Sequence, residues 1–337
     1  MQQKGCPNVL LTIISIAVLG GLSVVPIYAV GMDQSILWVK QHVYWPLLHG
    51  TESVLKDTIF SPFFIFAVGF ILILERLYPV NPKQKMLSMG FMHDSTWLVL
   101  GLLFEGIVVV AYVKGLRAFY QTHLSFFTVE AVGRLPETVR FVWGLLLSDF
   151  LAWFQHWLKH KVPWFWQIHM VHHSQREINM FTDLRFHFLE YIISRIVVII
   201  PMMMFAVNTP QIAAYAVFNT WYSRLYHANI RSNFGFLRYI FVTPQTHRIH
   251  HSIEPRHQDK NFGVIFSFWD RIFKTQHENY DEYPETGIED SSFPLEKETS
   301  LLSLLMTPLQ QLIYPFFAIG RSLVSKKANS AAPDGRK

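Results

Sequence analysis

The histidines of this chain are the residues whose number and spacing most clearly indicate chemistry. There are 16 of them, and the figure His-x-x-His-His occurs twice, at residues 169–173 and at residues 247–251. With this histidine content, one such figure is expected by chance only roughly 0.03 times in a chain of this length. Chance therefore does not account for two copies, and the repeat predicts that both segments serve one site.

A third motif, His156 and His160, precedes the first figure. Residues three or four apart lie on the same side of a helix, so each motif would present its imidazoles on one face. Neutral imidazole binds iron, zinc, copper and nickel. Eight clustered imidazoles exceed the four ligands of one tetrahedral zinc ion, so we predict two metal ions. Spacing alone leaves both iron and zinc open.

The predicted metal ligands come from these three motifs and from one further histidine near the same face. They are His156, His160, His169, His172, His173, His227, His247, His250 and His251. All except His227 are also the predicted catalytic residues. Asp149 lies seven residues before His156 on one predicted helix face, and we expect its carboxylate to hold an imidazole N–H. Asp259 is a candidate for the same role or for capping a helix, and His187 for a further ligand or a substrate contact.

The segments that must position these histidines are strongly apolar. Hydrophobic residues make up 51% of the 337 residues and charged residues 16%, against about a quarter charged in soluble domains. This balance predicts an all-α integral membrane protein. About four transmembrane helices are expected, at residues 5–32, 58–74, 96–113 and from residue 141 onward. The net charge of +5 suits anionic lipid headgroups, and the absence of clustered basic stripes excludes a nucleic-acid partner.

A fifth apolar run, residues 196–222, decides whether the two His-x-x-His-His figures can meet. A single long helix would place them on opposite faces of the membrane. Residues 208–210, Asn-Thr-Pro, favour a turn instead. We therefore expect a helical hairpin that returns the chain to the face it left, where the histidine-rich segments form a helical cap. With the N-terminus in the cytosol, this face is the cytosolic one.

Three regions follow from this organisation. Residues 1–135 hold the N-terminal transmembrane helices and loops, residues 136–290 the histidine-rich catalytic domain, and residues 291–337 a C-terminal segment with a polar tail. Within the last region, residues 301–320 are apolar but contain two prolines. We expect an interfacial or re-entrant helix there, interrupted by the prolines.

The order and spacing of the motifs resemble the fatty acid hydroxylase/sterol desaturase superfamily of membrane oxygenases. The similarity runs through roughly residues 140–275. It comprises the histidines of 156–160, His-x-x-His-His-Ser at 169–174, Arg-x-His at 185–187, TPQTHRIHHS at 243–252, DKNFG at 259–263 and FWDRIFKT at 268–275. The branch containing alkylglycerol monooxygenase and bacterial sterol-desaturase-like proteins is the most similar.

The resemblance implies a non-haem di-iron centre that uses O2 and two electrons to hydroxylate or desaturate a lipid C–H bond. The lipid would be a fatty acyl chain, a sterol or a related compound. No cytochrome b5 domain is fused to the chain, so the electrons would come from a separate donor. The expected location is the bacterial inner membrane or the eukaryotic endoplasmic reticulum. The oligomeric state, the lipid and the oxidised carbon stay open.

Two other functions are compatible with clustered histidines. A zinc-dependent membrane lipid hydrolase would need a carboxylate base, for which Glu177 and Glu190 are the nearby candidates. A haem-carrying electron-transfer subunit would need paired axial histidines on different helices within the bilayer. Histidine triples gathered at one membrane face favour the oxygenase over both.

Overall fold

The computed structural model describes residues 62–104, 110–128 and 130–331. This part of the chain is helical and contains no β-strand, only isolated bridges such as Pro79 with Ile230 and Ser252 with Thr286. The helical fold class predicted from the sequence is therefore confirmed for these residues. The predicted transmembrane segment 5–32 lies outside them.

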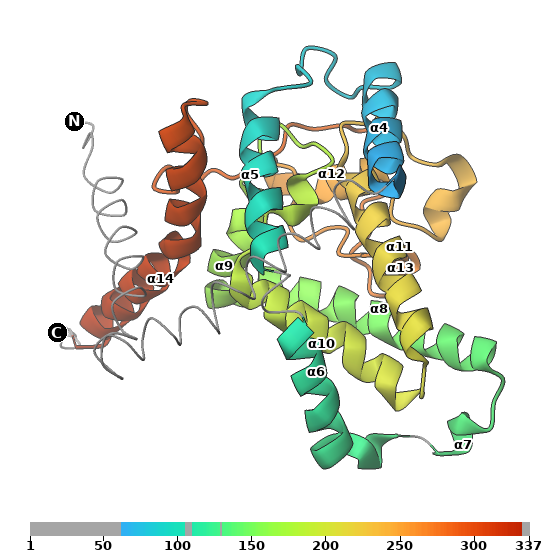
Figure 1. Ribbon diagram of the computed structural model, residues 1–337. Coiled ribbons are helices and arrows are strands. Elements are labelled where there is room, and N and C mark those ends of the chain that lie inside the picture. The colour runs from blue at the N-terminus through green and yellow to red at the C-terminus, as the bar shows by residue number, and fades with distance from the viewer. Residues whose placement is uncertain (1–61, 105–109, 129, 332–337) are drawn as a thin grey trace, which may run out of the picture.

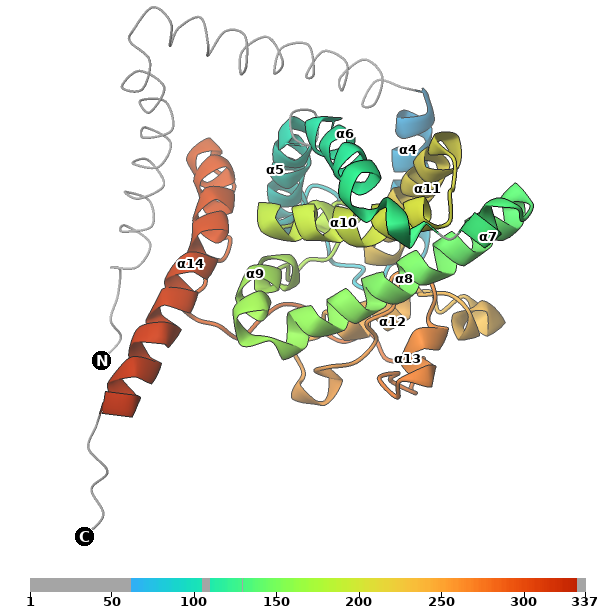
Figure 2. The same cartoon turned by 90° about the horizontal axis from the view of Figure 1, so that it is seen from below.

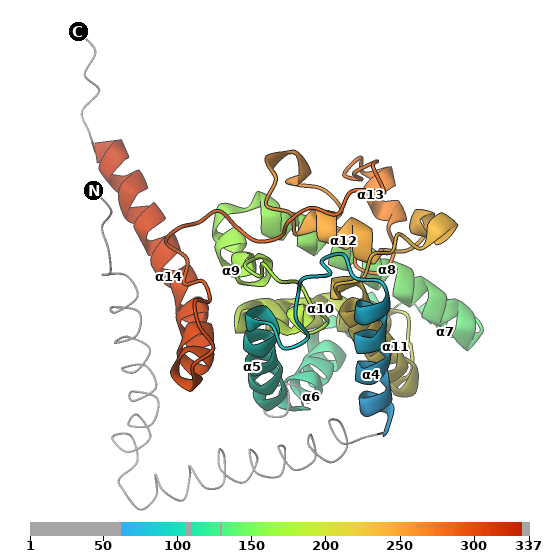
Figure 3. The ribbon, with the colours of Figure 1, turned by 90° about the horizontal axis from the view of Figure 1, so that it is seen from above.

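The first described helices precede the histidine-bearing helices in the chain. They are α4 (Pro62–Leu77), α5 (Met89–Phe104), α6 (Val110–Phe119) and the short α7 (Glu130–Gly133). A single π-helical turn, Tyr120–Leu124, follows α6 directly. In Figures 1 and 3, α4 and α5 are roughly parallel to each other but stand apart.

The remaining helices carry or support the histidine motifs. They are α8 (Glu137–Lys161), α9 (Pro163–His173), α10 (Phe188–Met204), α11 (Thr209–His227), α12 (Pro244–His250), α13 (Phe268–Ile272) and α14 (Leu301–Ala331). Helix α8 packs along α10 and against α9 (Figure 2). The close approach of α8 to α10 uses Gly144, where a Cβ atom would stand 3.1 Å from Met202 Sδ and from Val207 Cγ2.

Short capping sequences fix where these helices begin. Asn208 accepts a hydrogen bond from the Gln211 N–H at the start of α11, so the predicted turn at residues 208–210 is confirmed, whereas the return of the chain to one membrane face stays a prediction. Thr243 and Thr246 form a reciprocal capping box at the start of α12, with Pro244 at the first helical position. The cap of α12 matters because the second His-x-x-His-His figure lies in this seven-residue helix and its C-cap.

Helix α14 corrects the expectation of an interrupted C-terminal segment. It runs from Leu301 to Ala331 with Pro308 and Pro315 inside it, although Figure 1 shows that it bends. Each proline removes one backbone hydrogen bond. Packing compensates for this loss, because Tyr314 is buried in a core cluster with Trp97, Met170 and other apolar side chains.

Among the described helices, only α14 is both long and apolar enough to cross a membrane, over Leu301–Ser322. Helices α4 and α5 have 16 residues each. The expected count of about four membrane-spanning helices therefore stays a prediction, as do the boundaries of the three regions.

Candidate metal centre

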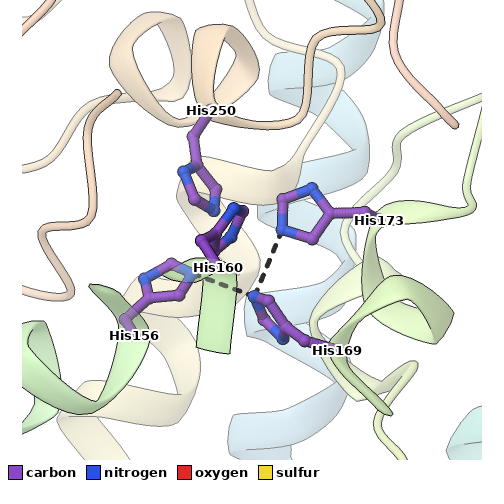
Figure 4. A group of neighbouring side chains, drawn as sticks. All are labelled: His156, His160, His169, His173 and His250. Atoms are coloured by element: carbon purple, nitrogen blue, oxygen red, sulfur yellow. Dashed lines mark hydrogen bonds between the residues drawn. The ribbon is translucent and has the colours of Figure 1, made fainter. Parts of the chain in front are cut away.

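All nine predicted histidine ligands come together in two adjacent groups. The first histidine group consists of His156, His160, His169, His173 and His250 (Figure 4). The second histidine group consists of His172, His227, His247 and His251. Within each group, the nitrogens that face one another all lie within 4.8 Å. The groups meet where the rings of His173 and His251 stack, with centroids 4.3 Å apart.

The two groups share helices, so that sequence neighbours belong to different groups. On α9, His173 belongs to the first group and His172 to the second. At the end of α12, His250 belongs to the first group and His251 to the second. Successive residues of a helix point about 100° apart. Each of these helices therefore directs imidazoles into both groups at once.

In the first group, backbone and carboxylate oxygens determine which nitrogen of two rings carries the proton. His156 Nδ1 lies 2.9 Å from the Phe262 carbonyl oxygen, and His169 Nδ1 lies 2.9 Å from a Glu190 carboxylate oxygen. Because an oxygen of either kind accepts, both Nδ1 atoms must be the donors in neutral imidazoles. Both Nε2 atoms then present lone pairs to each other, at 3.1 Å.

The close approach of these two Nε2 atoms indicates whether a metal ion would fit here. Two lone pairs at that distance repel unless a cation lies between or beside them. His250 Nδ1 likewise donates to the Lys260 carbonyl at 2.9 Å, and its Nε2, together with that of His160, has no hydrogen-bond partner among the described residues. Buried nitrogens with free lone pairs are costly without a partner. The donor set therefore fits a metal ion that prefers imidazole.

The second group has the same construction. His227 Nδ1 donates to the Ser223 carbonyl oxygen at 2.8 Å, which leaves its Nε2 as a lone-pair donor. That atom lies 3.2 Å from His172 Nε2 and 2.8 Å from His247 Nε2. His251 Nε2 lies 3.0 Å from His247 Nε2. Four imidazole nitrogens thus surround one point, which matches the coordination number of a tetrahedral site.

Burial keeps these imidazoles neutral. It is the largest cause that lowers the pKa of His250 and of His227, each to about 3. It also lowers the pKa of His172 and His251 well below the usual value, with the neighbouring histidines contributing further. Metal ligation requires the unprotonated ring, so the site is prepared for cations near neutral pH.

Glu190 at the start of α10 is a functional candidate that the motif pattern does not assign to the metal centre. Its Oε1 accepts hydrogen bonds from His169 Nδ1 at 2.9 Å and from Lys159 Nζ at 2.6 Å, and the carboxylate is fully buried. Burial alone would raise the pKa of Glu190, but His169 and Lys159 together lower it to about 2. An ionised carboxylate therefore fixes the orientation of His169.

The structure gives the three supporting candidates other roles. Asp149 accepts hydrogen bonds from the Ile265 and Phe266 backbone N–H groups and from Trp269 Nε1, so the expectation that it holds an imidazole is wrong. Asp259 forms an ion pair with Lys161 at 2.5 Å near the surface.

His187 caps α10 instead of facing either histidine group. Its Nδ1 accepts from the Leu189 N–H, and its Nε2 donates to the Leu312 carbonyl oxygen at 2.9 Å. Both ring nitrogens are therefore used by the backbone.

Two cavities border the histidine groups. The larger, of about 290 Å³, reaches only the first group, through His160, His173 and His250. The smaller, of about 210 Å³, is bordered by members of both groups. Its wall includes apolar residues such as Phe186 and polar residues such as Gln155. This second cavity is the place where one bound molecule would be near both groups.

Comparison with known proteins agrees with this geometry. Residues 141–275 match the family model for fatty acid hydroxylase, and they include all nine histidines of the two groups. These residues therefore form a fatty acid hydroxylase domain, and the superfamily resemblance seen in the motifs is confirmed for them. No solved structure matches the chain with significant similarity.

Several curated proteins are similar to this chain. Ornithine lipid hydroxylase OlsE of Rhizobium tropici is 24% identical over 221 residues, covering 65% of this chain and 67% of the relative. Human alkylglycerol monooxygenase is 32% identical over 143 residues, 42% of this chain and 32% of the relative. A cholesterol 25-hydroxylase-like protein of Danio rerio is 23% identical over 252 residues, 70% and 98% of the two chains.

The match thus spans only about a third of the length of the alkylglycerol monooxygenase. All three names describe hydroxylases or monooxygenases, which supports an oxidoreductase and leaves the particular reaction to be proposed.

Proposed function

We propose that this protein is a membrane-bound, O2-dependent lipid hydroxylase whose nine grouped histidines hold two iron ions. The observation that carries the proposal is the cavity bordered by both histidine groups, with His156 and His169 from the first and His172, His227 and His247 from the second. A substrate there would be close to two metals at once. The names of the relatives, which act on lipids or alkylglycerols, agree with this function.

The metals would supply O2 activation, with two electrons delivered by a separate donor protein or reductant. One oxygen atom would enter a C–H bond of the lipid and the other would leave as water. The protein's part is positional. Glu190 keeps the His169 proton on Nδ1, and the Phe262 carbonyl does the same for His156, so that both Nε2 atoms face the metals.

The cavity wall suggests an amphiphilic substrate. Leu184, Phe186 and Val264 provide apolar surface, whereas Gln155 and Asn219 provide polar groups. Gln155 Nε2 and Asn219 Oδ1 are buried and have no hydrogen-bond partner among the described residues. A lipid that places an ester, ether, amide or hydroxyl group against them would satisfy both. The oxidised carbon would then lie near the polar part of the lipid.

Exposed apolar side chains support a location in the membrane. Helix α4 exposes Phe66 and Leu77 to more than half of their full area, and α14 exposes Leu301 and Leu302 to more than two thirds. Exposed apolar surface of this extent marks contact with lipid or another protein. We propose that the histidine groups lie at the cytosolic face, as expected for a cytosolic N-terminus, in the bacterial inner membrane or the endoplasmic reticulum.

Lipid extracts from cells with and without the protein test the proposal. Growth under ¹⁸O2 should produce a lipid heavier by one labelled oxygen atom in cells that contain the protein. His172→Ala should abolish this product and reduce the bound iron, while His123→Ala, at an exposed position outside both groups, should retain both. A product lighter by two hydrogens would indicate a desaturase instead. A product whose oxygen comes from water would refute the oxygenase in favour of a zinc-dependent hydrolase.

A further inference from the structure

A third set of metal-binding side chains lies outside both histidine groups. It consists of His257, in the single 3-10 turn Pro255–His257 after α12, and of His277 and Glu282 in the segment that follows α13. We propose that this third site, defined by these three residues, binds one divalent cation of the zinc type. It is separate from the two metals of the proposed catalytic centre.

The donor atoms of the third site converge on one point. His257 Nε2 lies 2.9 Å and His277 Nε2 lies 3.4 Å from the same carboxylate oxygen, Glu282 Oε2. The two imidazole planes are nearly perpendicular, at 82°, with centroids 4.8 Å apart. Two imidazoles and one carboxylate are a common ligand set for a zinc ion that keeps its fourth position open.

Neighbouring groups hold two of the three ligands in place. Ser252 Oγ lies 2.9 Å from His257 Nδ1, which directs Nε2 of this ring toward Glu282. The other carboxylate oxygen, Glu282 Oε1, accepts from Asn279 Nδ2 at 2.6 Å and from Arg256 at 3.2 Å. Oε2 is therefore the oxygen left for a metal. Outer contacts of this kind orient metal ligands in known sites.

Hydrogen bonding within the set explains only part of this arrangement. A neutral His257 whose proton is on Nε2 would satisfy its own contact with Glu282. His277 Nε2 is nevertheless buried, and its 3.4 Å approach to that same oxygen does not form a hydrogen bond. A cation between the three donors gives this nitrogen a partner and allows His257 Nδ1 to donate to Ser252. The set is reachable from solvent, since the His277 and Glu282 side chains are 17% and 22% exposed.

The position of the third site gives it a consequence for the catalytic domain. His257 follows α12, which carries the second His-x-x-His-His figure, whereas His277 and Glu282 belong to the segment after α13. A bound cation would tie this segment to the end of α12. The backbone already joins them where the Gly287 N–H donates to the His251 carbonyl oxygen at 3.1 Å. A cation at the third site would thus also link two segments of the chain that support the second histidine group.

Metal counting on the purified full-length protein tests the inference. After removal of metals and reloading with Zn²⁺, the wild type should bind three equivalents per chain. His277→Ala and Glu282→Gln should each bind one equivalent fewer. Glu254→Gln is the matched control, because this carboxylate also pairs with Arg256 but is not part of the set, and it should bind three equivalents.

A second measurement distinguishes the loss of one specific binding site from a general loss of metal binding. Zn²⁺ should raise the unfolding temperature of the wild type and of Glu254→Gln in two saturable phases, and His277→Ala should lack one of them. Equal counts in the wild type and both site variants would overturn the inference, whatever the total. The hydrogen-bond network alone would then account for these residues. Because the test is a difference between variants, it does not depend on which metal ions, or how many, the two histidine groups hold.

Discussion

Replacement of Glu190 by glutamine tests how the metal centre is built. The change keeps the size of the side chain but removes the negative charge that accepts hydrogen bonds from His169 Nδ1 and Lys159 Nζ, at 2.9 and 2.6 Å. Two effects follow from one substitution. His169 loses the carboxylate that holds its proton on Nδ1, and Lys159 becomes a buried cation without a countercharge.

The two effects have different magnitudes. Loss of an outer hydrogen bond to a ligating histidine typically lowers metal affinity about 10- to 100-fold, or about 1.4 to 2.7 kcal/mol. Removal of one partner from a buried ion pair lowers the free energy of unfolding by about 3 to 5 kcal/mol. The side chains of Lys159 and Glu190 are 7% and 0% exposed, so solvent screens the pair very little. Glu190→Gln should therefore be both destabilised and weaker in metal binding.

The double variant Lys159→Met/Glu190→Gln separates the effects. Removing the lysine charge should restore most of the stability, measured by chemical denaturation, but not the metal affinity, measured by competition with a chelator. Full metal affinity in Glu190→Gln would refute the role assigned to this carboxylate. Recovery of both quantities in the double variant would show that Glu190 acts only through the stability of the fold.

Three further substitutions have definite expected outcomes. Arg185 is fully buried between Asp94 and Glu296, so Arg185→Lys, which cannot reproduce the forked contact, should lower the free energy of unfolding by about 3 kcal/mol; wild-type stability on denaturation would contradict this. His187→Asn keeps a helix-capping side chain and should retain the full metal content by mass spectrometry, whereas loss of one equivalent would make His187 a ligand. Gly263→Ala places a Cβ atom 2.8 Å from Val242 and 2.9 Å from the Phe266 carbonyl, and it should cost about 1 to 3 kcal/mol. Gly101→Ala, in open space, is its control in thermal unfolding, and equal effects of the two would refute the packing argument.

Local patterns in the sequence were sufficient to predict the helical class and the turn between α10 and α11. Asn208 and the proline two residues later signal the turn by chemistry that acts over a few residues. The histidine repeat is likewise a short-range pattern. By contrast, the division of the nine histidines into two groups depends on how α8, α9, α11 and α12 cross. No spacing within one helix contains that information.

The comparison of Asp149 with Glu190 shows the same limit. Asp149 shares a helix face with His156, but seven residues separate them by about 10 Å along the axis, which is too far for a hydrogen bond. It instead serves the backbone of the loop before α13. Glu190 reaches His169 across 21 residues, because α10 packs against α8 and α9. Tertiary packing, not periodicity, selects the carboxylate.

The interruption predicted at the prolines of α14 is wrong for a related reason. Pro308 and Pro315 each disfavour helix as isolated residues. The neighbouring Gln311 side chain donates to the Pro294 carbonyl oxygen and to Glu296, and Tyr314 bonds to Asp290. These long-range contacts hold the helix together where its local sequence would favour a break.

The alternation of sequence neighbours between the two histidine groups has a consequence for assembly. When a cation binds the first group, it fixes the rotation of α9 through His169 and His173 and that of α12 through His250. The same rotation brings His172 and His251 into place for the second group. Uptake of one ion thus prepares the binding of the next, so the chain should pass from empty to doubly loaded with little of the singly loaded form. A chain with one histidine group filled and the other empty should therefore be scarce.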